Sequence, residues 1–300
     1  MATPTASLLD PAAVAKGEAL GLVARHIVEG YRVGEHRSPF HGFAIEFAQH
    51  REYSIGDDLR HLDWKVLGRT DRYYIKQYEQ DTNFVAHLIV DGSESMMYGS
   101  DKQTKFDYAK TLAACLAYLV LTQSDSIAVN IFDTEIRDRV TRTDNKGKIH
   151  EIMHRLANFQ AKEGTQIAKT LHDVAATIKA RSIAILISDL FDDEEALQKN
   201  IERIRFQGTE VIVFHVLDPY ELEFPFTGTV KFIGLESGPE LETVPSAIRK
   251  SYLESFNAFC KRMREICDRS ASHYVLCNTG TPLNETLSEY LAFRQNRRTR

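Results

Sequence analysis

The run from Phe84 to Val90 constrains the fold of this chain more than any other stretch. Its sequence, FVAHLIV, is apolar at nearly every position, rich in β-branched residues, and followed by a polar turn containing Gly92. This pattern is typical of a strand buried on both faces of a parallel sheet. Similar runs follow at Ser126–Phe132, Ser182–Ile187 and Glu210–Leu217, and they alternate with helical patterns such as Lys105–Gln123. We therefore predict an α/β fold with an open, mostly parallel sheet and helices on both faces.

Oxygen-bearing side chains follow two of these runs. Asp91, Ser93 and Ser95 stand at every second position after the first run, and Asp189 follows the run that starts at Ser182. Thr165 opens a further helical pattern. Ligands of open α/β sheets bind beyond the carboxyl ends of the strands, where helices begin. An all-oxygen cluster with few carboxylates suits a hard cation such as Mg²⁺.

These five residues, in this order on such loops, resemble the metal-ion-dependent adhesion site of von Willebrand factor A (vWA) domains. In that family the first Asp and both Ser contact the metal, and the Thr and the last Asp bind it directly or through water. The resemblance implies a site for Mg²⁺ or Mn²⁺ and a three-layer, Rossmann-like fold. It also implies six strands, one of them a short antiparallel edge. The predicted metal ligands are Asp91, Ser93, Ser95, Thr165 and Asp189.

A second resemblance lies upstream of the sheet. The pattern Arg51-Glu52-Tyr53-x-x-Gly56-Asp57-Asp58-x-Arg60-x-x-Asp63-Trp64, followed by Arg69, is similar to the signature of a bacterial family of vWA-domain proteins. That family is known as domain of unknown function 58, and its members are typically encoded beside MoxR-type AAA+ ATPases. The resemblance extends from about Gly34 onward. It implies that such an ATPase is the protein partner.

The chain is predicted to divide near residue 80. Residues 1–80 form an N-terminal accessory segment, with a helix from Pro11 to about Tyr31 and irregular and β structure after it, packed on the main domain. Residues 81–300 form the vWA-like domain, with an inserted hairpin at about 221–235 around Thr227-Gly228. The dense charges of the accessory segment allow two interpretations: an ion-paired network that holds it on the sheet domain, or a docking surface for a partner.

Composition limits the partners and the compartment. A net charge of −5 argues against nucleic acid as a general partner. The four cysteines lack C-x-x-C spacing, which favours reduced thiols over disulfides or zinc ligation. The N-terminus shows no signal-peptide pattern, and no apolar run is long enough to span a bilayer. We therefore expect a cytoplasmic protein without a membrane span.

Three functions remain open at this point. The first is a metal-dependent binding module that acts with the ATPase in a chaperone-like or complex-assembly role, where an acidic side chain of a client protein completes the metal coordination. The second is a metal-dependent hydrolase or phosphotransferase that uses Asp91 as nucleophile; such chemistry would want a second Asp two residues later, where Ser93 stands. The third is a structural scaffold. We favour the binding module and predict no enzymatic activity.

Overall fold

The computed structural model describes residues 45–54, 62–70, 72–80, 85–101, 103–123, 125–161, 164–178, 182–234 and 240–298. The chain divides into two compact units, one over Phe40–Asn83 and one that includes Phe84–Arg300. The predicted helix from Pro11 to Tyr31 and the signature residues 55–61 lie outside the described residues.

The smaller unit contains an antiparallel strand pair and one helix. Strand β1 (Ile45–Glu52) pairs with β2 (Tyr74–Gln80), with a bulge between Phe47 and Gln49, and α2 (Trp64–Thr70) lies between them in the chain. Asp63 caps this helix, because its Oδ1 accepts hydrogen bonds from the backbone N–H groups of Lys65 and Val66 at 2.9 and 3.2 Å. Trp64 is 67% exposed within the described structure.

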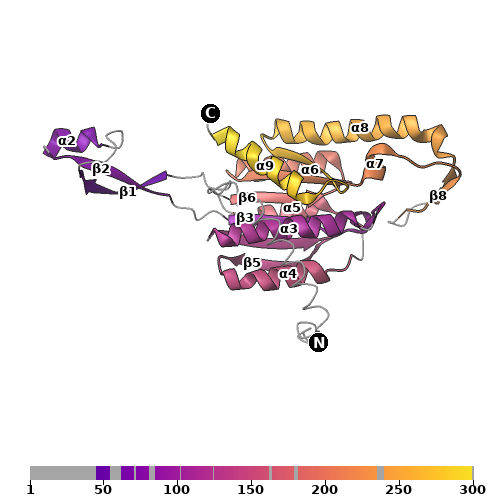
Figure 1. The fold of residues 1–300 in the computed structure, drawn as a ribbon, viewed down its shortest axis with the longest axis horizontal. Helices are drawn as coiled ribbons and strands as arrows, with labels where there is room; N and C mark the ends of the chain where they lie inside the picture. Colours follow the sequence, from indigo (N-terminus) through magenta and orange to yellow (C-terminus); the bar gives the residue numbers. More distant parts are fainter. Residues whose placement is uncertain are drawn as a thin grey trace. The chain divides into compact units, whose positions relative to one another are not determined.

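The larger unit is built around a six-stranded sheet in the order β10-β7-β6-β3-β4-β5 (Figure 1). All neighbouring strands are parallel except β4 and β5, which are antiparallel. Every residue of β3, β4, β6 and β7 is buried, as expected for runs that are apolar on both faces. The predicted six-stranded fold with an antiparallel edge is therefore confirmed. The strands are β3 (Val85–Asp91), β4 (Ser126–Phe132), β5 (Ile136–Thr143), β6 (Ser182–Ser188), β7 (Glu210–Leu217) and β10 (His273–Asn278).

Helices cover both faces of this sheet (Figure 1). One layer contains α3 (Lys105–Thr122) with α4 (Ile149–Asn158) and α9 (Leu283–Arg298). The other contains α5 (Ile167–Ala175), α6 (Glu194–Phe206) and α8 (Pro245–Arg269), whose apolar side chains pack with those of β6 and β7. Helix α3 starts with a capping box, in which Thr104 and Asp107 each bond the other's backbone N–H group.

The order of the strands reverses between β3 and β6. From β3 the chain runs outward through β4 to β5, and it then returns to β6 on the other side of β3 before continuing to β7 and β10. The loops that follow β3 and β6 therefore diverge at the carboxyl ends of these two neighbouring strands. Open α/β sheets bind their ligands at such a point.

The insertion after β7 differs from the hairpin expected at about 221–235. A short helix, α7 (Pro219–Glu223), comes first, and the antiparallel pair joins β8 (Val230–Phe232) to β9 (Leu241–Thr243). The second strand thus lies further along the chain than the turn signal at Thr227-Gly228 indicated. Among the described residues, no helix is both long and apolar enough to cross a membrane.

Candidate metal centre

The five predicted ligands lie at the point where the strand order reverses. Asp91 is the last residue of β3. Ser93 follows in the turn, at the N-cap position of a 3₁₀ helix over Glu94–Met97, which contains Ser95. Asp189 directly follows β6, and Thr165 lies just before α5. Since β3 and β6 are adjacent and parallel, their carboxyl ends place these loops side by side.

Asp91 is the centre of the hydrogen bonding here. Its Oδ1 accepts from the backbone N–H of Ser93 at 3.0 Å. Its Oδ2 accepts from the hydroxyl groups of Ser188 at 2.6 Å and Thr165 at 3.4 Å. The hydroxyl oxygens of Ser93 and Ser95 lie 3.1 Å apart. Four of the five predicted residues are thus brought together by direct hydrogen bonds.

The fifth residue, Asp189, is linked to Asp91 through charge. Both side chains are fully buried. Burial, and then the negative charge of Asp189, raise the pKa of Asp91 to about 7, although hydrogen bonds from Ser188 and Ser93 oppose the rise. Two neighbouring buried carboxylates repel each other, and a bound divalent cation would relieve that repulsion. Two carboxylates with three hydroxyl groups fit the oxygen preference of Mg²⁺ or Mn²⁺.

A lysine that the sequence analysis missed lies beside this cluster. Lys105, the first residue of α3, has only 1% of its surface exposed, and its Nζ donates to Asp189 Oδ2 at 2.8 Å and to Glu221 Oε1 at 2.7 Å. Although burial lowers the pKa of this ammonium group, the charges of Asp189 and Glu221 outweigh burial and raise it. The site therefore contains its own fixed positive charge. One signal was present in the sequence: a lysine at the first position of a helix meets the positive end of the helix dipole and needs anions nearby.

The loop after β6 is held by further buried groups. His215 on β7 donates from Nε2 to the carbonyl of Asp189 at 2.8 Å, and its Nδ1 lies 2.7 Å from the hydroxyl of Tyr274. Burial lowers the pKa of His215 to about 4, so the ring is neutral at neutral pH. Leu190 adopts a left-handed conformation with φ of 63°, and its N–H donates to Ser188 Oγ at 2.9 Å. Such strain persists only where surrounding contacts enforce it.

Gly92, in the loop after β3, allows the ring of Phe159 to approach the backbone closely. A Cβ atom at this position would clash with the ring of Phe159. The N–H of Gly92 also donates to the carbonyl of Phe132 at 2.7 Å, which fixes the chain where it leaves β3. A side chain at residue 92 would therefore displace the turn that carries Ser93 and Ser95.

Clusters of three or more His, Cys, Asp or Glu residues that could hold a metal ion are absent from the part of the chain that the structure describes. The candidate centre depends instead on hydroxyl groups, which a set of His, Cys, Asp and Glu residues does not include.

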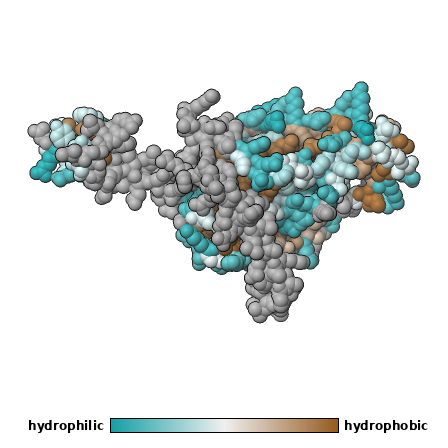
Figure 2. Space-filling view, viewed as in Figure 1, coloured by the Kyte–Doolittle hydropathy of each residue, from teal (hydrophilic) through white to brown (hydrophobic). Residues whose placement is uncertain are grey.

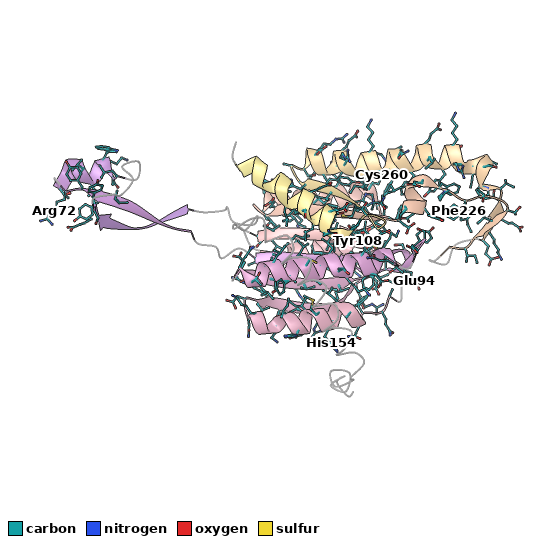
Figure 3. The ribbon with its side chains drawn as sticks, in the orientation of Figure 1. Arg72, Glu94, Tyr108, His154, Phe226 and Cys260 are labelled. Atoms are coloured by element: carbon teal, nitrogen blue, oxygen red, sulfur yellow. The ribbon has the colours of Figure 1, made fainter. Side chains whose placement is uncertain are left out.

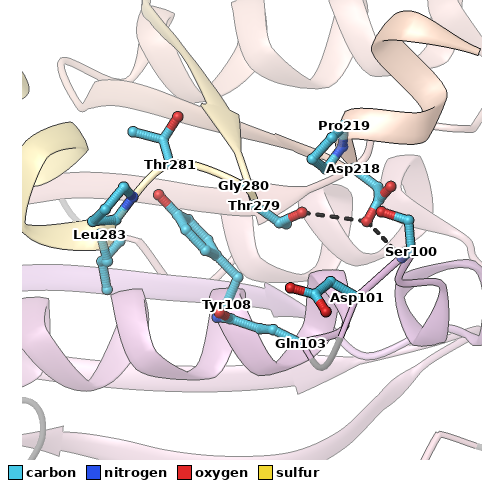
Figure 4. Close-up of a pocket in the computed structure, with 11 residues that line it drawn as sticks. Ser100, Asp101, Gln103, Tyr108, Asp218, Pro219, Thr279, Gly280, Thr281 and Leu283 are labelled. Carbon is cyan, nitrogen blue, oxygen red and sulfur yellow. Dashed lines mark hydrogen bonds between the residues drawn. The ribbon is translucent and has the colours of Figure 1, made fainter. Parts of the chain in front are cut away.

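A second, polar pocket of about 320 Å³ lies at the carboxyl ends of the strands, as shown in Figure 4. There Asp218 Oδ2 accepts from the N–H of Ser100 at 2.9 Å and from the hydroxyl of Thr279 at 3.4 Å. This pocket is lined by none of the five predicted ligands; its Asp218 ties the loop after β3 to the start of α7.

The chain matches one family model and is similar to mycobacterial proteins. Residues 49–261 match the family described as protein of unknown function DUF58. An uncharacterized protein of Mycobacterium tuberculosis is 27% identical over 247 residues, which cover 81% of this chain and 77% of that protein. An uncharacterized protein of Mycobacterium bovis gives the same values of 27%, 81% and 77%.

Solved structures with detectable likeness are more distant. The conserved hypothetical protein BatB from Bacteroides thetaiotaomicron is 16% identical, with a TM-score of 0.48, over 71% of this chain and 100% of that one. The vWA domain of SpRpn10 is 12% identical, with a TM-score of 0.39, over 68% of this chain and 94% of that one.

Proposed function

The chain belongs to the family of proteins of unknown function DUF58, and from that premise we propose that it is a metal-dependent protein-binding module. The proposed ion is Mg²⁺ or Mn²⁺, held by Asp91, Ser93, Ser95, Thr165 and Asp189. The observation that carries the proposal is that groups from three separate segments bond the buried carboxylate of Asp91: the turn at Ser93, Thr165 before α5, and Ser188, the neighbour of Asp189, at the end of β6. Donors with so few negative charges leave the ion partly positive, so it attracts an acidic side chain from a partner.

The proposed partner is a MoxR-type AAA+ ATPase, acting with this module in a chaperone-like or complex-assembly role on a client protein. This part of the proposal is supported by the resemblance of the signature around Arg51 and Trp64 to proteins encoded beside such ATPases. We also propose a cytoplasmic location. Its support is that all four cysteines are free thiols, and oxidising compartments favour disulfides.

The environment of Asp91 disfavours the alternative of a hydrolase or phosphotransferase. A nucleophilic carboxylate needs a free oxygen directed at its substrate. Asp91 is instead fully buried, and both of its oxygens accept hydrogen bonds from neighbouring groups. The residue two positions later is Ser93, which cannot serve as the acid or base that such chemistry requires. We therefore propose binding without turnover.

Metal binding is tested first on Asp91→Ala. Because this carboxylate receives hydrogen bonds from Thr165 before α5 and from Ser188 at the end of β6, its loss should abolish calorimetric binding of Mg²⁺ or Mn²⁺ while the far-UV spectrum stays native. The exposed Asp144 offers a matched control, and Asp144→Ala should bind the ion as the wild type does. A variant at residue 91 that binds one equivalent with unchanged affinity would show that the site is assigned wrongly.

Partner binding is then measured by biolayer interferometry with the purified ATPase. We expect association in Mg²⁺, loss in EDTA, and weakening in the double variant Ser93→Ala with Ser95→Ala. The exposed serines of α8 supply the control, Ser251→Ala with Ser255→Ala, which should bind normally. Affinity that is indifferent to EDTA would move the docking surface to the charged N-terminal segment. Steady hydrolysis of nucleotides or phosphate esters that disappears in Asp91→Ala would overturn the binding module altogether.

A further inference from the structure

A pocket of about 640 Å³ opens directly beside the candidate metal centre. Its lining includes Ser95, a predicted metal ligand, and Lys105, so the pocket and the metal centre are continuous. The rest of the lining is mainly aromatic and comes from the loops after β3 and β6 and from the α7, β8 and α8 segments. The aromatic members are Tyr98, Phe191, Tyr220, Phe224, Phe226, Phe232 and Tyr252. A volume of this size falls in the range of ordinary ligand pockets, roughly 300–1,000 Å³.

The aromatic wall is held in place by its own packing. The ring of Phe224 lies 4.3 Å from that of Tyr252 and 5.7 Å from that of Phe232, and Phe226 packs edge-on against Phe232 at 5.2 Å. Arg249 on α8 donates to the carbonyls of Phe224 at 3.0 Å and Phe226 at 2.7 Å. A wall that is already ordered loses little conformational freedom when a ligand enters.

Two backbone conformations around the pocket are unfavourable. Phe224, which ends α7, is left-handed with φ of 48°, although only 4% of its surface is exposed. Leu190, between Asp189 and Phe191, is left-handed as well. Left-handed residues other than glycine cost on the order of 1 kcal/mol each and concentrate at binding sites. Both turns aim aromatic side chains at the pocket rather than into the core of the sheet.

Large apolar side chains remain exposed at the rim of this pocket. Phe191 is 38% exposed, Tyr220 41% and Ile233 65%. Figure 2 shows apolar surface gathered at the end of the larger unit that carries β8, and Figure 3 places Phe226 at this end together with Glu94, the neighbour of Ser95. Clustered exposed apolar side chains beside polar groups are typical of surfaces that bind a partner.

We propose that this pocket binds an aromatic side chain of the partner protein, from the same segment whose carboxylate reaches the metal centre. The inference rests on the proposed function and specifies its partner: an acidic residue with Phe, Tyr or Trp close to it in the sequence. Aromatic walls favour an aromatic occupant, because rings attract one another edge to face and bury about 150–250 Å² each. Continuity through Ser95 and Lys105 allows one short segment to reach both places.

The test uses the full chain immobilised in Mg²⁺ and a displayed peptide library of the form Xaa-Xaa-Glu-Xaa-Xaa. We expect Phe, Tyr or Trp to be enriched roughly tenfold over Ala at one of the four variable positions, which corresponds to about 1.4 kcal/mol. The double variant Tyr220→Ala with Ile233→Ala removes exposed rim side chains and should abolish the enrichment. Phe206→Ala on α6 is the matched control, because Phe206 is 95% exposed and lies outside the pocket. Val230→Trp, which fills the pocket instead of stripping its rim, should act like the double variant.

The outcomes separate this inference from the function on which it rests. Selection that needs Glu and Mg²⁺ but shows no aromatic preference overturns the pocket and leaves the binding module intact. An aromatic preference that persists in EDTA and in a library with Gln in place of Glu supports the pocket and contradicts the metal-dependent function. The proposal for the pocket is overturned if aromatic residues are enriched equally on the pocket variants and on the wild type. It is also overturned if no peptide is selected above bare beads. The ATPase measurement then tests the metal-dependent binding function independently.

Discussion

At the scale of single residues, the candidate centre is a balance of buried charges. The carboxyl groups of Asp91, Asp189 and Glu221 lie together with one cationic side chain among the described site residues, that of Lys105. A buried carboxylate pair is costly unless a cation compensates it. Lys105 supplies part of that compensation permanently, and a divalent ion would supply the remainder.

This balance predicts how Lys105→Met should behave. Without the ammonium group, Asp189 and Glu221 face each other uncompensated, so the melting temperature in EDTA should fall. Mg²⁺ should then raise the melting temperature by more than it does in the wild type, because the ion takes over the neutralisation of Asp189. Thermal melts with and without Mg²⁺ measure both effects. Lys110→Met on the same helix, whose ion pair with Asp107 is at the surface, should show the wild-type shift; an equal shift in Lys105→Met would contradict the balance.

A second residue-scale prediction concerns pH. Burial, aided by the positive charges of Arg139 and Arg142, lowers the pKa of His87 on β3 to about 4, below its ordinary value of 6.5. The unfolded chain therefore binds a proton more readily than the folded one, and stability is lost as pH falls from 6.5 toward 4. Between pH 7 and pH 5 this histidine should cost the wild type about 2 kcal/mol.

His87→Leu should remove that loss, so its free energy of unfolding should fall by about 2 kcal/mol less than that of the wild type over the same range. Urea denaturation at matched pH values measures the difference. The exposed His150 supplies the control, and His150→Leu should follow the wild-type slope. If the free energy of unfolding falls with pH equally in His87→Leu and the wild type, the pKa of this histidine does not differ between the folded and unfolded states as its burial requires.

At the scale of elements, α8 ends in an unfavourable way that a single substitution can correct. Ala271 has φ of 49°, and the N–H groups of Ala271 and Ser272 donate to the carbonyls of Asp268 and Cys267 at 3.1 and 2.8 Å. This is the Schellman arrangement, whose left-handed position favours glycine. Ala271→Gly should therefore raise the free energy of unfolding by about 1 kcal/mol.

The same substitution in the middle of α8 is the matched control. Ala258 is exposed and helical, so Ala258→Gly should lower the free energy of unfolding by about 1 kcal/mol. Urea denaturation of the two variants should therefore give changes of opposite sign. Destabilisation by both would show that the end of α8 does not hold Ala271 in the left-handed conformation.

The sequence predicts those helices and strands whose apolar pattern and end signals lie within the element itself. The strands at Ser126–Phe132 and Glu210–Leu217 match their apolar runs, and α3 begins at the predicted Lys105. The insertion after β7 could not be predicted in this way, because Arg249 and Tyr252 of α8 hold its backbone carbonyls. Its conformation depends on contacts with a helix that follows it in the chain.

In the candidate site, too, the residues with a local sequence pattern could be predicted and those that depend on distant contacts could not. Asp91, Ser93 and Ser95 could be found because their spacing lies within one turn, and their resemblance to a known motif extended the search to Thr165 and Asp189. The start of a helix was the one signal for Lys105, and it names no partner. Lys105 bonds Asp189 and Glu221, which lie 84 and 116 residues further along the chain, so the sequence alone does not assign Lys105 or Glu221 to the site. The aromatic pocket was missed for a similar reason: its rings come from loops that only the folded sheet brings together.

At the scale of the whole molecule, the chain consists of two units with separate secondary structure. All six strands of the sheet, and the described helices that cover it, come from residues 85–298. The buried apolar side chains of this unit form their own core, which includes residues of β6, β7, α5 and α6. The smaller unit has its own strand pair and capped helix. That the N-terminal segment packs on the main domain stays a prediction from the sequence.

This division predicts the behaviour of a fragment over residues 84–300. Because the sheet and its core lie within that range, the fragment should melt in one cooperative transition, remain monomeric in size-exclusion chromatography, and bind Mg²⁺ as the full chain does. If the fragment loses the ATPase, residues 1–83 contain a docking surface; if it keeps the ATPase with the same dependence on Mg²⁺, recognition lies at the metal centre. A fragment that aggregates or melts without cooperativity would contradict the expectation. It would show instead that the N-terminal residues pack on the sheet unit and cover apolar surface there. The charges around Arg51 and Asp63 allow such packing through ion pairs.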